Sequence, residues 1–389
     1  MMPDRATLRL WLLRLFSAIP TARATAPKPG LWTPRRILLI RPDHVGDLLF
    51  ATPALRLLRD SLPDAHLTAL VGPWGQAVWQ GNPCLDEILV CRFPGFARRP
   101  KESLLAPYRQ LWVTARQLRS EPFDLALVLR FDHWWGAWLA KLAGIPERVG
   151  YDIRECLPFL TRVLHYEDQR HEVVQNLVLA QEVVRQTGHE PGDTRNELEF
   201  ALAQPDREYV DRLLAERGVT PTQPLVAIHP GAGAPVKLWS VEKWARTADA
   251  LVKEWNTSVV ITGGQGELDL AWAVCAWMRE RAIVAAGLTS LGQLAALFAR
   301  CNLVLGPDCG PLHLAATVGV PTVHLYGPVD AAKFGPWGNA QRHIVVVSQR
   351  SCIPCNRLDY RDDELPQHPC VREIEPDAVL EAARKALTS

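Results

Sequence analysis

The feature of this sequence that most constrains its fold is the repeated alternation of short apolar runs with longer segments of helical periodicity. In the first half of the chain the apolar runs are nearly unbroken, which is typical of parallel strands buried on both faces of a sheet. These expected strands cover residues 37–40, 66–71, 87–90 and 125–129. Helical patterns lie between them, for example at residues 48–61 and 104–118. Repeated strand–helix units of this kind predict an open, doubly wound parallel sheet.

A second series of the same kind follows an expected helix at residues 166–188 and a loop rich in helix breakers at residues 188–194. Its expected strands cover residues 225–229, 258–262, 282–285, 303–305 and 322–325, and its expected helices cover residues 241–254, 268–281 and 291–300. The sequence therefore predicts an α/β fold with two Rossmann-like doubly wound domains that face an interdomain cleft. Ligands of open sheets bind beyond the carboxyl ends of the strands, so both domains should direct loops into that cleft.

The chain is long enough for two hydrophobic cores, with 389 residues of which 48% are hydrophobic. We expect an N-terminal extension over residues 1–34, a first domain over 35–190 and a second domain over 191–374. Residues 375–389 should form a C-terminal helix that returns to the first domain.

Charge and cysteine content exclude several classes of protein. The formal net charge of +1 lacks the strongly basic character of a nucleic-acid-binding domain. Nine cysteines are too sparse in a chain of this length for a disulfide scaffold. No apolar stretch reaches the roughly 20 residues that a membrane span requires. These observations predict a cytoplasmic protein.

The N-terminal extension contains an apolar segment at residues 9–16 that is interrupted by Arg14. The following Ala22-Arg23-Ala24 imitates a signal-peptidase site, but the apolar core before it is broken by charge. Two interpretations are open: a basic amphipathic helix on a membrane surface, or a frayed extension without function.

The first loop whose residues could take part in catalysis follows the first expected strand and reads Arg41-Pro-Asp-His-Val-Gly-Asp47. Gly46 allows a tight turn and places Asp47 at the start of the next helix. Asp47 is either the N-cap of that helix or a carboxylate held at a strand end as a general base. Asp43 and His44 flank it and could tune its acidity.

The second loop follows the first strand of the second domain and runs from His229 to Ser240, which should cap the next helix. Gly231 and Gly233 suit backbone amides turned toward a phosphate, and Lys237 supplies a mobile cation. The spacing fits neither the P-loop nor Gly-x-Gly-x-x-Gly, which argues against a dehydrogenase. The loop is therefore either a phosphate site or a turn with a solvated lysine.

The third loop, at residues 306–316, joins an expected strand to a helix that begins at Pro311. The free amides and positive dipole end of a helix N-terminus favour a diphosphate. Gly310 lets the backbone approach a ligand, and Asp308 can accept hydrogen bonds from sugar hydroxyls. His313 falls in the first helical turn and should face the same ligand.

Together these loops resemble glycosyltransferase family 9, the heptosyltransferase family of lipopolysaccharide synthesis. The resemblance covers about residues 35–385. Its signatures are residues 41–55, His229-Pro-Gly-Ala-Gly233 with Lys237 and Trp239, residues 306–316, and residues 319–328. It implies a GT-B architecture with an acceptor-side first domain and a donor-binding second domain. Cys309 stands where a hydroxyl residue is expected, and residues 93–103 match no particular member.

The resemblance also implies residue roles. Asp47 would deprotonate the acceptor hydroxyl and Lys237 would neutralise the donor diphosphate. Donor contacts would come from Gly231, Gly233, Gly263, Glu267, Asp308, Gly310 and His313. The reaction would invert the anomeric centre in one displacement. The donor, a nucleotide sugar such as ADP-heptose, is a substrate, and no cofactor is expected. The acceptor would be a lipid-linked or other cell-surface glycan at the inner membrane face, where the protein could be peripherally bound.

The sequence contains no Asp-x-Asp motif, so the leaving-group charge is expected to fall to Lys237 and the helix N-terminus without a metal. Cys352, Cys355 and Cys370, with His368 nearby, have zinc-like ligand types, and they are read either as packed thiols or as a metal or redox group. Two other functions are open: a nucleotide-sugar epimerase on the same fold, and a catalytically silent sugar-nucleotide-binding protein.

Overall fold

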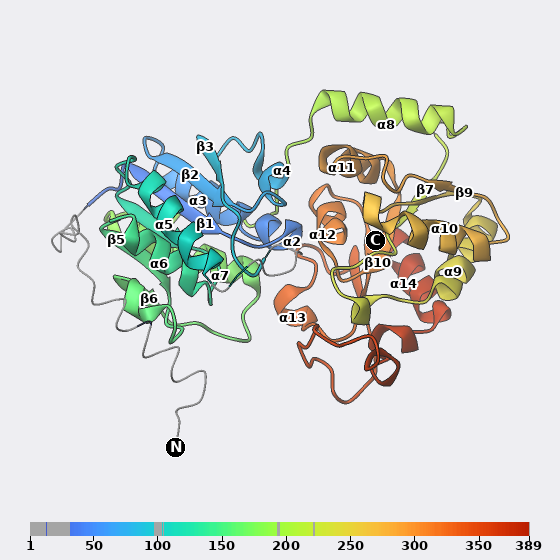
Figure 1. Ribbon diagram of the computed structural model, residues 1–389. Coiled ribbons are helices and arrows are strands. Elements are labelled where there is room, and N and C mark those ends of the chain that lie inside the picture. Colours follow the sequence, from blue (N-terminus) through green and yellow to red (C-terminus); the bar gives the residue numbers. More distant parts are fainter. Residues whose placement is uncertain are drawn as a thin grey trace, which may run out of the picture. The chain divides into compact units, whose positions relative to one another are not determined.

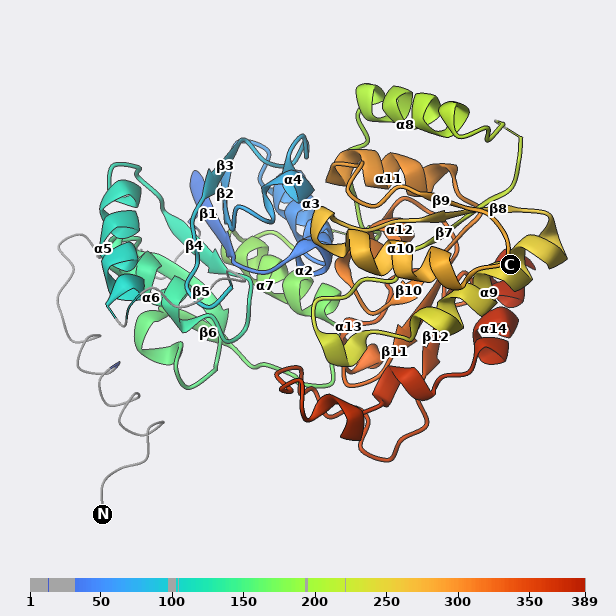
Figure 2. The same ribbon diagram turned by 45° about the vertical axis from the view of Figure 1, so that its right-hand side comes forward.

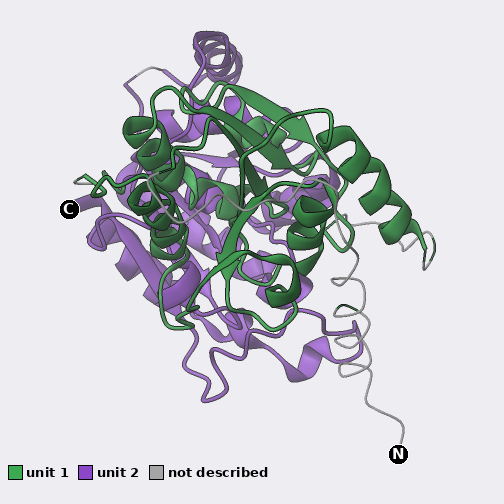
Figure 3. Ribbon diagram, turned by 90° about the vertical axis from the view of Figure 1, so that its left-hand side faces the viewer, with its two compact units in different colours: residues 1–196 green, residues 197–389 purple. Residues whose placement is uncertain are grey.

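The computed structural model describes residue 13 and residues 32–96, 103, 105–192, 195–220 and 222–388. The chain divides into two compact units, unit 1 over residues 1–196 and unit 2 over residues 197–389 (Figure 3). The domain boundary expected from the sequence, at residue 190, lies slightly before the boundary at residue 196 in the structure. The expected amphipathic segment at residues 9–16 lies outside the described residues, apart from Leu13.

Unit 1 contains a parallel sheet with the strand order β3-β2-β1-β4-β5-β6 (Figure 1). Its strands are β1 (Arg36–Arg41), β2 (His66–Val71), β3 (Glu87–Val90), β4 (Leu125–Val128), β5 (Glu147–Tyr151) and β6 (Arg162–Leu164). Its helices are α2 (Val45–Leu49), α3 (Thr52–Ser61), α4 (Gln76–Trp79), α5 (Ala106–Leu118), α6 (Trp134–Leu142) and α7 (Glu172–Gln186), with a 3-10 turn at Leu157–Phe159.

Unit 2 repeats the arrangement with the strand order β12-β11-β10-β7-β8-β9. Its strands are β7 (Leu225–Ile228), β8 (Ser258–Ile261), β9 (Ala282–Val284), β10 (Leu303–Pro307), β11 (Thr322–Tyr326) and β12 (His343–Val347). Its helices are α8 (Gln204–Glu216), α9 (Val241–Trp255), α10 (Leu268–Trp277), α11 (Leu291–Arg300), α12 (Gly310–Thr317), α13 (Ala331–Phe334) and α14 (Pro376–Thr388). The described part of unit 2 also contains 3-10 turns at Pro235–Lys237, Gln265–Glu267, Leu365–Gln367 and Cys370–Glu373.

Helices cover both faces of each sheet, because the strands carry apolar side chains on both faces. In β7, Val226 and Ile228 pack in one apolar cluster with residues of α9, α10 and α14. Leu225 and Ala227 pack on the opposite face with residues of α8, α11 and α12. Because side chains of a strand point alternately to its two faces, a continuous apolar run is needed when both faces are buried. The prediction of two doubly wound parallel sheets is thus confirmed.

The strand orders place the switch points of the two sheets. In unit 1 the order reverses between β1 and β4, which pair in parallel with Ile40 opposite Val128. In unit 2 it reverses between β7 and β10, with Ile228 opposite Leu305. Loops leaving the carboxyl ends at such a point diverge to opposite sides and leave a crevice for ligands. The three loops selected from the sequence follow β1, β7 and β10.

Several expected elements differ in detail. The helix expected at residues 48–61 is divided into α2 and α3, and Pro53 lies in the first turn of α3. Helix α10 ends at Trp277, because Asp249 accepts hydrogen bonds from the backbone N–H groups of Arg279 and Glu280 in the next segment. Strands β5, β6 and β12 were not predicted. In β5 the charged Glu147 and Arg148 interrupt the apolar pattern.

The expectation that the C-terminal helix returns to the first domain is wrong. Helix α14 packs on unit 2, against α9 and strands β10, β11 and β12. Its apolar face, including Val379, Ala383 and Ala386, is buried in the cluster that also contains Val226 and Leu305. Periodicity predicts the apolar face of a helix but not its partner, and here that face packs on the sheet of unit 2 (Figure 2).

Candidate active site

The loop after β1 places two carboxylates differently. Asp43 is buried at 2% exposure, whereas the Asp47 side chain is 31% exposed. His44 is the N-cap residue of α2, and Asp47 lies in the first turn of that helix. The interpretation of Asp47 as an N-cap is therefore wrong, and its carboxylate is available for another role.

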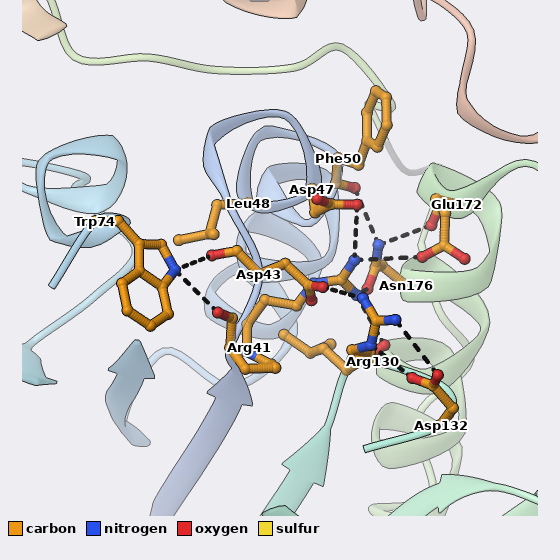
Figure 4. Close-up of polar contacts among 12 residues, drawn as sticks. Arg41, Asp43, Asp47, Leu48, Phe50, Trp74, Arg130, Asp132, Glu172 and Asn176 are labelled. Carbon is orange, nitrogen blue, oxygen red and sulfur yellow. Dashed lines mark hydrogen bonds and ion pairs between the residues drawn. The ribbon is translucent and has the colours of Figure 1, made fainter. Parts of the chain in front are cut away.

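Arg41 at the end of β1 organises these carboxylates. Its side chain is 1% exposed, and its Nε lies 2.7 Å from Asp43 Oδ2. One terminal nitrogen donates to the carbonyl of Leu129 and to Oδ1 of Asn176, at 2.9 and 3.1 Å. The other lies 3.3 Å from Glu172 Oε2 and 3.7 Å from Asp47 Oδ1. Figure 4 shows this guanidinium among the carboxylates of Asp43, Asp47 and Glu172.

Arg130, which follows β4, supplies a second cation. It forms ion pairs with Asp43 and, at 2.5 Å, with Asp132. Its guanidinium also lies over the ring of Phe96, 5.1 Å from the centroid. Burial alone would raise the pKa of Asp43, but the charges of Arg41 and Arg130 outweigh it and hold that pKa below its ordinary value. Asp43 is therefore a fixed negative charge.

The Asp47 carboxyl titrates in a different range. Burial by the surrounding site and the negative charge of Asp43 raise its pKa to about 7, although Arg41 and Arg130 act in the opposite direction. A carboxylate with a pKa near neutrality can accept a proton more readily than an ordinary aspartate. Two carboxylates with pKa values driven apart are a common signature of a reaction centre.

The remaining expected residues of this loop have structural surroundings. His44 is half-buried, with its ring 5.4 Å from that of Trp74. The Trp74 indole N–H donates to the backbone carbonyls of Pro42 and Asp43, and so it fixes the loop. Gly46 is buried inside α2. The negative charge of Asp43 acts to raise the pKa of Asp47, and the tuning role of Asp43 stays a prediction.

Sequence reasoning missed Arg130, Glu172 and Asn176. Arg130 could have been found, because it follows a predicted strand in the segment Arg-Phe-Asp-His, at the edge where ligands bind. His133 in the same segment is buried against the rings of Phe93 and Trp135, and burial lowers its pKa to about 3. It is therefore neutral.

In unit 2 the loops after β7 and β8 meet at Glu267. His229 is buried, with Nδ1 3.0 Å from the hydroxyl of Thr262 and Nε2 3.8 Å from Glu267 Oε2. The Glu267 carboxylate accepts a hydrogen bond from the backbone N–H of Gly264 at 2.7 Å. Gly263 is buried next to the Glu267 side chain. The loops thus bring Glu267 beside Gly231.

Gly231 has no room for a side chain. A Cβ there would lie 1.9 Å from Glu267 Oε1. We expect Gly231→Ala to displace the Glu267 carboxylate from Gly264 and to lower the free energy of unfolding by about 1.5 kcal/mol, the lower end of the contribution of a hydrogen bond to a charged group, because this bond is exposed. Denaturant unfolding measures this loss.

Gly266→Ala is the matched control, because a Cβ at Gly266 meets no atom within 4 Å. The double variant Gly231→Ala with Glu267→Ala should lose little more than Glu267→Ala alone, because the obstacle is gone. An equal loss in both backgrounds would contradict the argument.

The loops after β7 and β10 meet at Asp308. Lys237, in the 3-10 turn Pro235–Lys237, places its ammonium 2.7 Å from Asp308 Oδ2. His313 Nε2 lies 3.7 Å from Asp308 Oδ1. Burial would raise the pKa of Asp308, but His313 and Lys237 hold it well below its ordinary value. Asp308 is thus a buried carboxylate that stays charged.

The start of α12 lies beside this carboxylate. The helix begins at Gly310, one residue before the expected Pro311, and Cys309 is its N-cap. Burial raises the pKa of the Cys309 thiol, so this residue is not an activated nucleophile. Gly310 is half-buried, and Gly233 in the other loop is exposed.

The three C-terminal cysteines differ in their surroundings, and Cys370 packs with Ala234 and Val236 of the loop after β7. Cys352 and Cys355 are exposed and Cys370 is buried. Cys355 Sγ lies 3.7 Å from the hydroxyl of Tyr360, whose ring stacks on His368 at 4.0 Å between centroids. Within the described parts of the chain, no group of three or more His, Cys, Asp or Glu side chains is arranged to hold a metal ion. The described helices include none that is long and apolar enough to cross a bilayer.

Comparison with known proteins bears on this arrangement. The sequence model of glycosyltransferase family 9 (heptosyltransferase) matches residues 111–364. The chain belongs to glycosyltransferase family 9. It is therefore a glycosyltransferase, as the resemblance of its loops implied. Family membership disfavours the epimerase interpretation.

Individual relatives agree with this assignment. The chain is 25% identical over 358 residues to lipopolysaccharide heptosyltransferase 2 of Escherichia coli K12, covering 89% of this chain and 97% of that protein. It matches the family 9 glycosyltransferase structure from Veillonella parvula with a TM-score of 0.76 and 26% identity, over 91% and 97% of the two chains. The E. coli ADP-heptose lipopolysaccharide heptosyltransferase II structure gives a TM-score of 0.69 at 21% identity, over 91% and 98%.

Proposed function

We propose that this family 9 glycosyltransferase transfers a heptose from ADP-heptose to a lipopolysaccharide-core or other cell-surface glycan acceptor, with inversion and without a metal ion. The observation that carries the proposal is Asp47, a partly exposed carboxylate with a pKa of about 7 at the switch point of unit 1. A residue that only binds a sugar nucleotide has no need of this raised pKa.

Asp47 is the general base. It accepts the proton of the acceptor hydroxyl as that oxygen attacks the anomeric carbon of the donor. Asp43 and Arg41 form a fixed ion pair beside it. The charge of Asp43 raises the pKa of Asp47, and the charge of Arg41 lowers it. In a single displacement the nucleoside diphosphate leaves from the opposite side of the sugar, which inverts the configuration.

The donor diphosphate binds at the switch point of unit 2. Among the described residues, the backbone N–H groups of Gly231, Ala232 and Gly233 donate no hydrogen bond, so they are open to an anion. The Lys237 ammonium donates hydrogen bonds to Oδ2 and to the backbone carbonyl of Asp308, at 2.7 and 3.3 Å. Its third N–H can donate to a phosphate.

The start of α12 supplies the second source of positive potential for the leaving group. Gly310 and His313 lie in its first turn, and Asp308, which precedes the helix, accepts hydrogen bonds from hydroxyls of the nucleotide sugar. Glu267, with Gly263 beside it, contacts the ribose or the base. The developing charge on the diphosphate is neutralised by Lys237 and the α12 N-terminus, in place of a metal.

The choice of donor and acceptor rests on relatives. The matched Escherichia coli structure is described as an ADP-heptose lipopolysaccharide heptosyltransferase, and its fold is shared over nearly the whole of both chains. A lipid-linked acceptor would place the enzyme at the inner face of the cytoplasmic membrane.

The proposal is tested by calorimetric titration with ADP-heptose, ADP-glucose and UDP-glucose in the presence of a chelator. We expect ADP-heptose to bind without added metal. Lys237→Met should weaken its binding by about 10–100-fold, the cost of one charged phosphate contact. Binding of adenosine, which has no diphosphate, should be nearly unchanged.

Lys253→Met is the matched control, because the Lys253 side chain is 59% exposed on α9. Preference for a UDP-sugar would overturn the assignment of the donor, and a requirement for a divalent cation would overturn the metal-free mechanism. Binding without transfer to any glycan acceptor would make the silent binding protein the better interpretation.

A further inference from the structure

The outward face of helix α5 combines apolar and basic side chains in one stripe. Leu105, which precedes the helix, is 75% exposed, and Trp112, Val113 and Tyr108 are 52%, 48% and 42% exposed. Arg109 and Arg116 are exposed among them. We call these six residues the α5 face.

The spacing of the α5 face makes it one continuous surface. Counted from Leu105, its members lie at i, i+3, i+4, i+7, i+8 and i+11, which is a single side of an α-helix. The opposite side of α5 carries Leu111, Ala115 and Leu118, which are buried with residues of α6 in the core of unit 1. In Figure 2, α5 lies at one edge of unit 1. Tyr108 contacts the ring of Trp138 of α6 at 6.1 Å between centroids, so it marks the margin of the exposed face.

No described residue compensates the charges of this face. Neither Arg109 nor Arg116 makes a side-chain hydrogen bond or ion pair with any described residue, and α5 itself contains no Asp or Glu. The nearest following carboxylate, Glu121, is paired with Arg36 at 2.9 Å. The side chain of Arg119, by contrast, donates a hydrogen bond to the backbone carbonyl of Leu142.

We propose that the α5 face docks unit 1 on the surface of an anionic lipid bilayer. Tryptophan and tyrosine favour the boundary between headgroups and acyl chains, and leucine and valine add apolar area. Arginines beside them are attracted to the negative surface potential of anionic lipid. An acidic protein partner would complement the arginines but would not explain four large exposed apolar side chains around them.

A comparison within the chain supports the choice of occupant. Trp272 and Trp277 on α10 are also exposed, at 59% and 60%. Their helix carries Asp269 and no arginine or lysine. Helix α5 thus differs from α10 in combining exposed tryptophan with arginines that pair with no described residue.

The inference is independent of the proposed reaction, because lipid binding is measured without turnover. The full chain is centrifuged with vesicles of phosphatidylglycerol and phosphatidylethanolamine, or of phosphatidylcholine alone. We expect binding to the anionic vesicles, weaker binding to the neutral ones, and loss of the difference as salt rises. Arg109→Glu with Arg116→Glu should lower partitioning by at least about 20-fold, since each arginine contributes about fivefold. Trp112→Ser should lower it by about tenfold.

Two matched controls test whether loss of exposed arginine charge or of an exposed tryptophan on other helices also weakens vesicle binding. Arg207→Glu with Arg212→Glu changes exposed arginines of α8, and Trp272→Ser removes the exposed tryptophan of α10; both should bind vesicles like the wild type. Because all substituted side chains are exposed, the melting temperatures should be unchanged.

Three results would overturn the proposal. The wild type could fail to bind anionic vesicles. The α5 variants could bind as tightly as the wild type, in particular if Arg9→Glu with Arg14→Glu abolished binding and so assigned it to the N-terminal extension. Sedimentation could instead show that the wild type self-associates and that the α5 variants do not, in which case a second copy occupies this face.

Discussion

Replacement of Asp47 by asparagine is expected to lower kcat for glycosyl transfer by about 10²–10⁴-fold, the usual contribution of a general base. Asparagine has nearly the same shape but cannot accept the proton of the acceptor hydroxyl. Donor affinity should stay within about threefold of the wild type, because the proposed donor contacts are in unit 2 and a base acts only in the transition state. Transfer kinetics and calorimetry on the same preparation separate the two effects.

The pH dependence of the wild type follows from the same carboxylate. Asp47 must be ionised to act, so kcat/KM should rise with pH and level off above about 7, the pKa of this group. An ordinary aspartate would give a plateau down to about pH 4. In Asp47→Asn the residual activity should lack this step. A step at pH 7 that survives in the variant would assign it to another group.

Stability should change in the opposite sense to activity. The pKa of Asp47 is raised on folding, so between about pH 4 and 7 the folded protein holds a proton that the unfolded chain has lost, and stability falls as pH rises. Asp47→Asn avoids this loss. The variant should therefore gain about 1–3 kcal/mol over the wild type above pH 7, and the gain should vanish toward pH 4.

Asp60→Asn provides the control for both readouts. Asp60 is an exposed carboxylate on α3, the helix after α2, so its removal should change neither rate nor stability appreciably. If Asp47→Asn kept more than a tenth of wild-type kcat, Asp47 would not be the base.

The sequence predicted the positions of the loops because local patterns suffice for them. A short apolar strand followed by glycine and proline, with aspartate in two of the three cases, identifies the loops after β1, β7 and β10 without knowledge of the fold. The neighbours of those loops were not predictable in the same way. The pairing of Lys237 with Asp308 joins residues 71 apart in the chain, and it depends on β7 lying beside β10.

The contacts around Asp47 also join segments that are far apart in the sequence, so sequence patterns could not predict them. Arg41 contacts Glu172 and Asn176, which are 131 and 135 residues further along the chain. Glu172 is the first residue of α7, where a carboxylate has a sufficient local explanation in the helix dipole. No periodicity in either segment indicates that the two must meet. Asp47, the proposed general base, and Asp43 beside it could thus be selected from the sequence, whereas the contacts of Arg41 with Glu172 and Asn176 could not.

The cluster around Arg41 leads to the largest expected loss of stability. Arg41→Met should lower the free energy of unfolding by about 3–5 kcal/mol, because it removes the cation of a buried cluster and leaves carboxylates behind. Asp43, at 2% exposure, would keep only Arg130 as a cationic partner, and Glu172 would lose the guanidinium at 3.3 Å. Urea unfolding of unit 1, followed by near-ultraviolet circular dichroism, measures the loss.

Arg36→Met on the same strand is the matched control. Arg36 pairs with Glu121 at 2.9 Å, but the two side chains are 29% and 45% exposed, so this variant should lose at most about 1 kcal/mol. A second readout separates charge from packing: without the Arg41 cation the pKa of Asp47 should rise further, moving the alkaline rise of kcat/KM to higher pH. Adding Glu172→Gln to Arg41→Met should recover part of the lost stability, because one stranded carboxylate is gone. Equal losses in Arg41→Met and Arg36→Met would show that burial of the cluster does not govern its energetics.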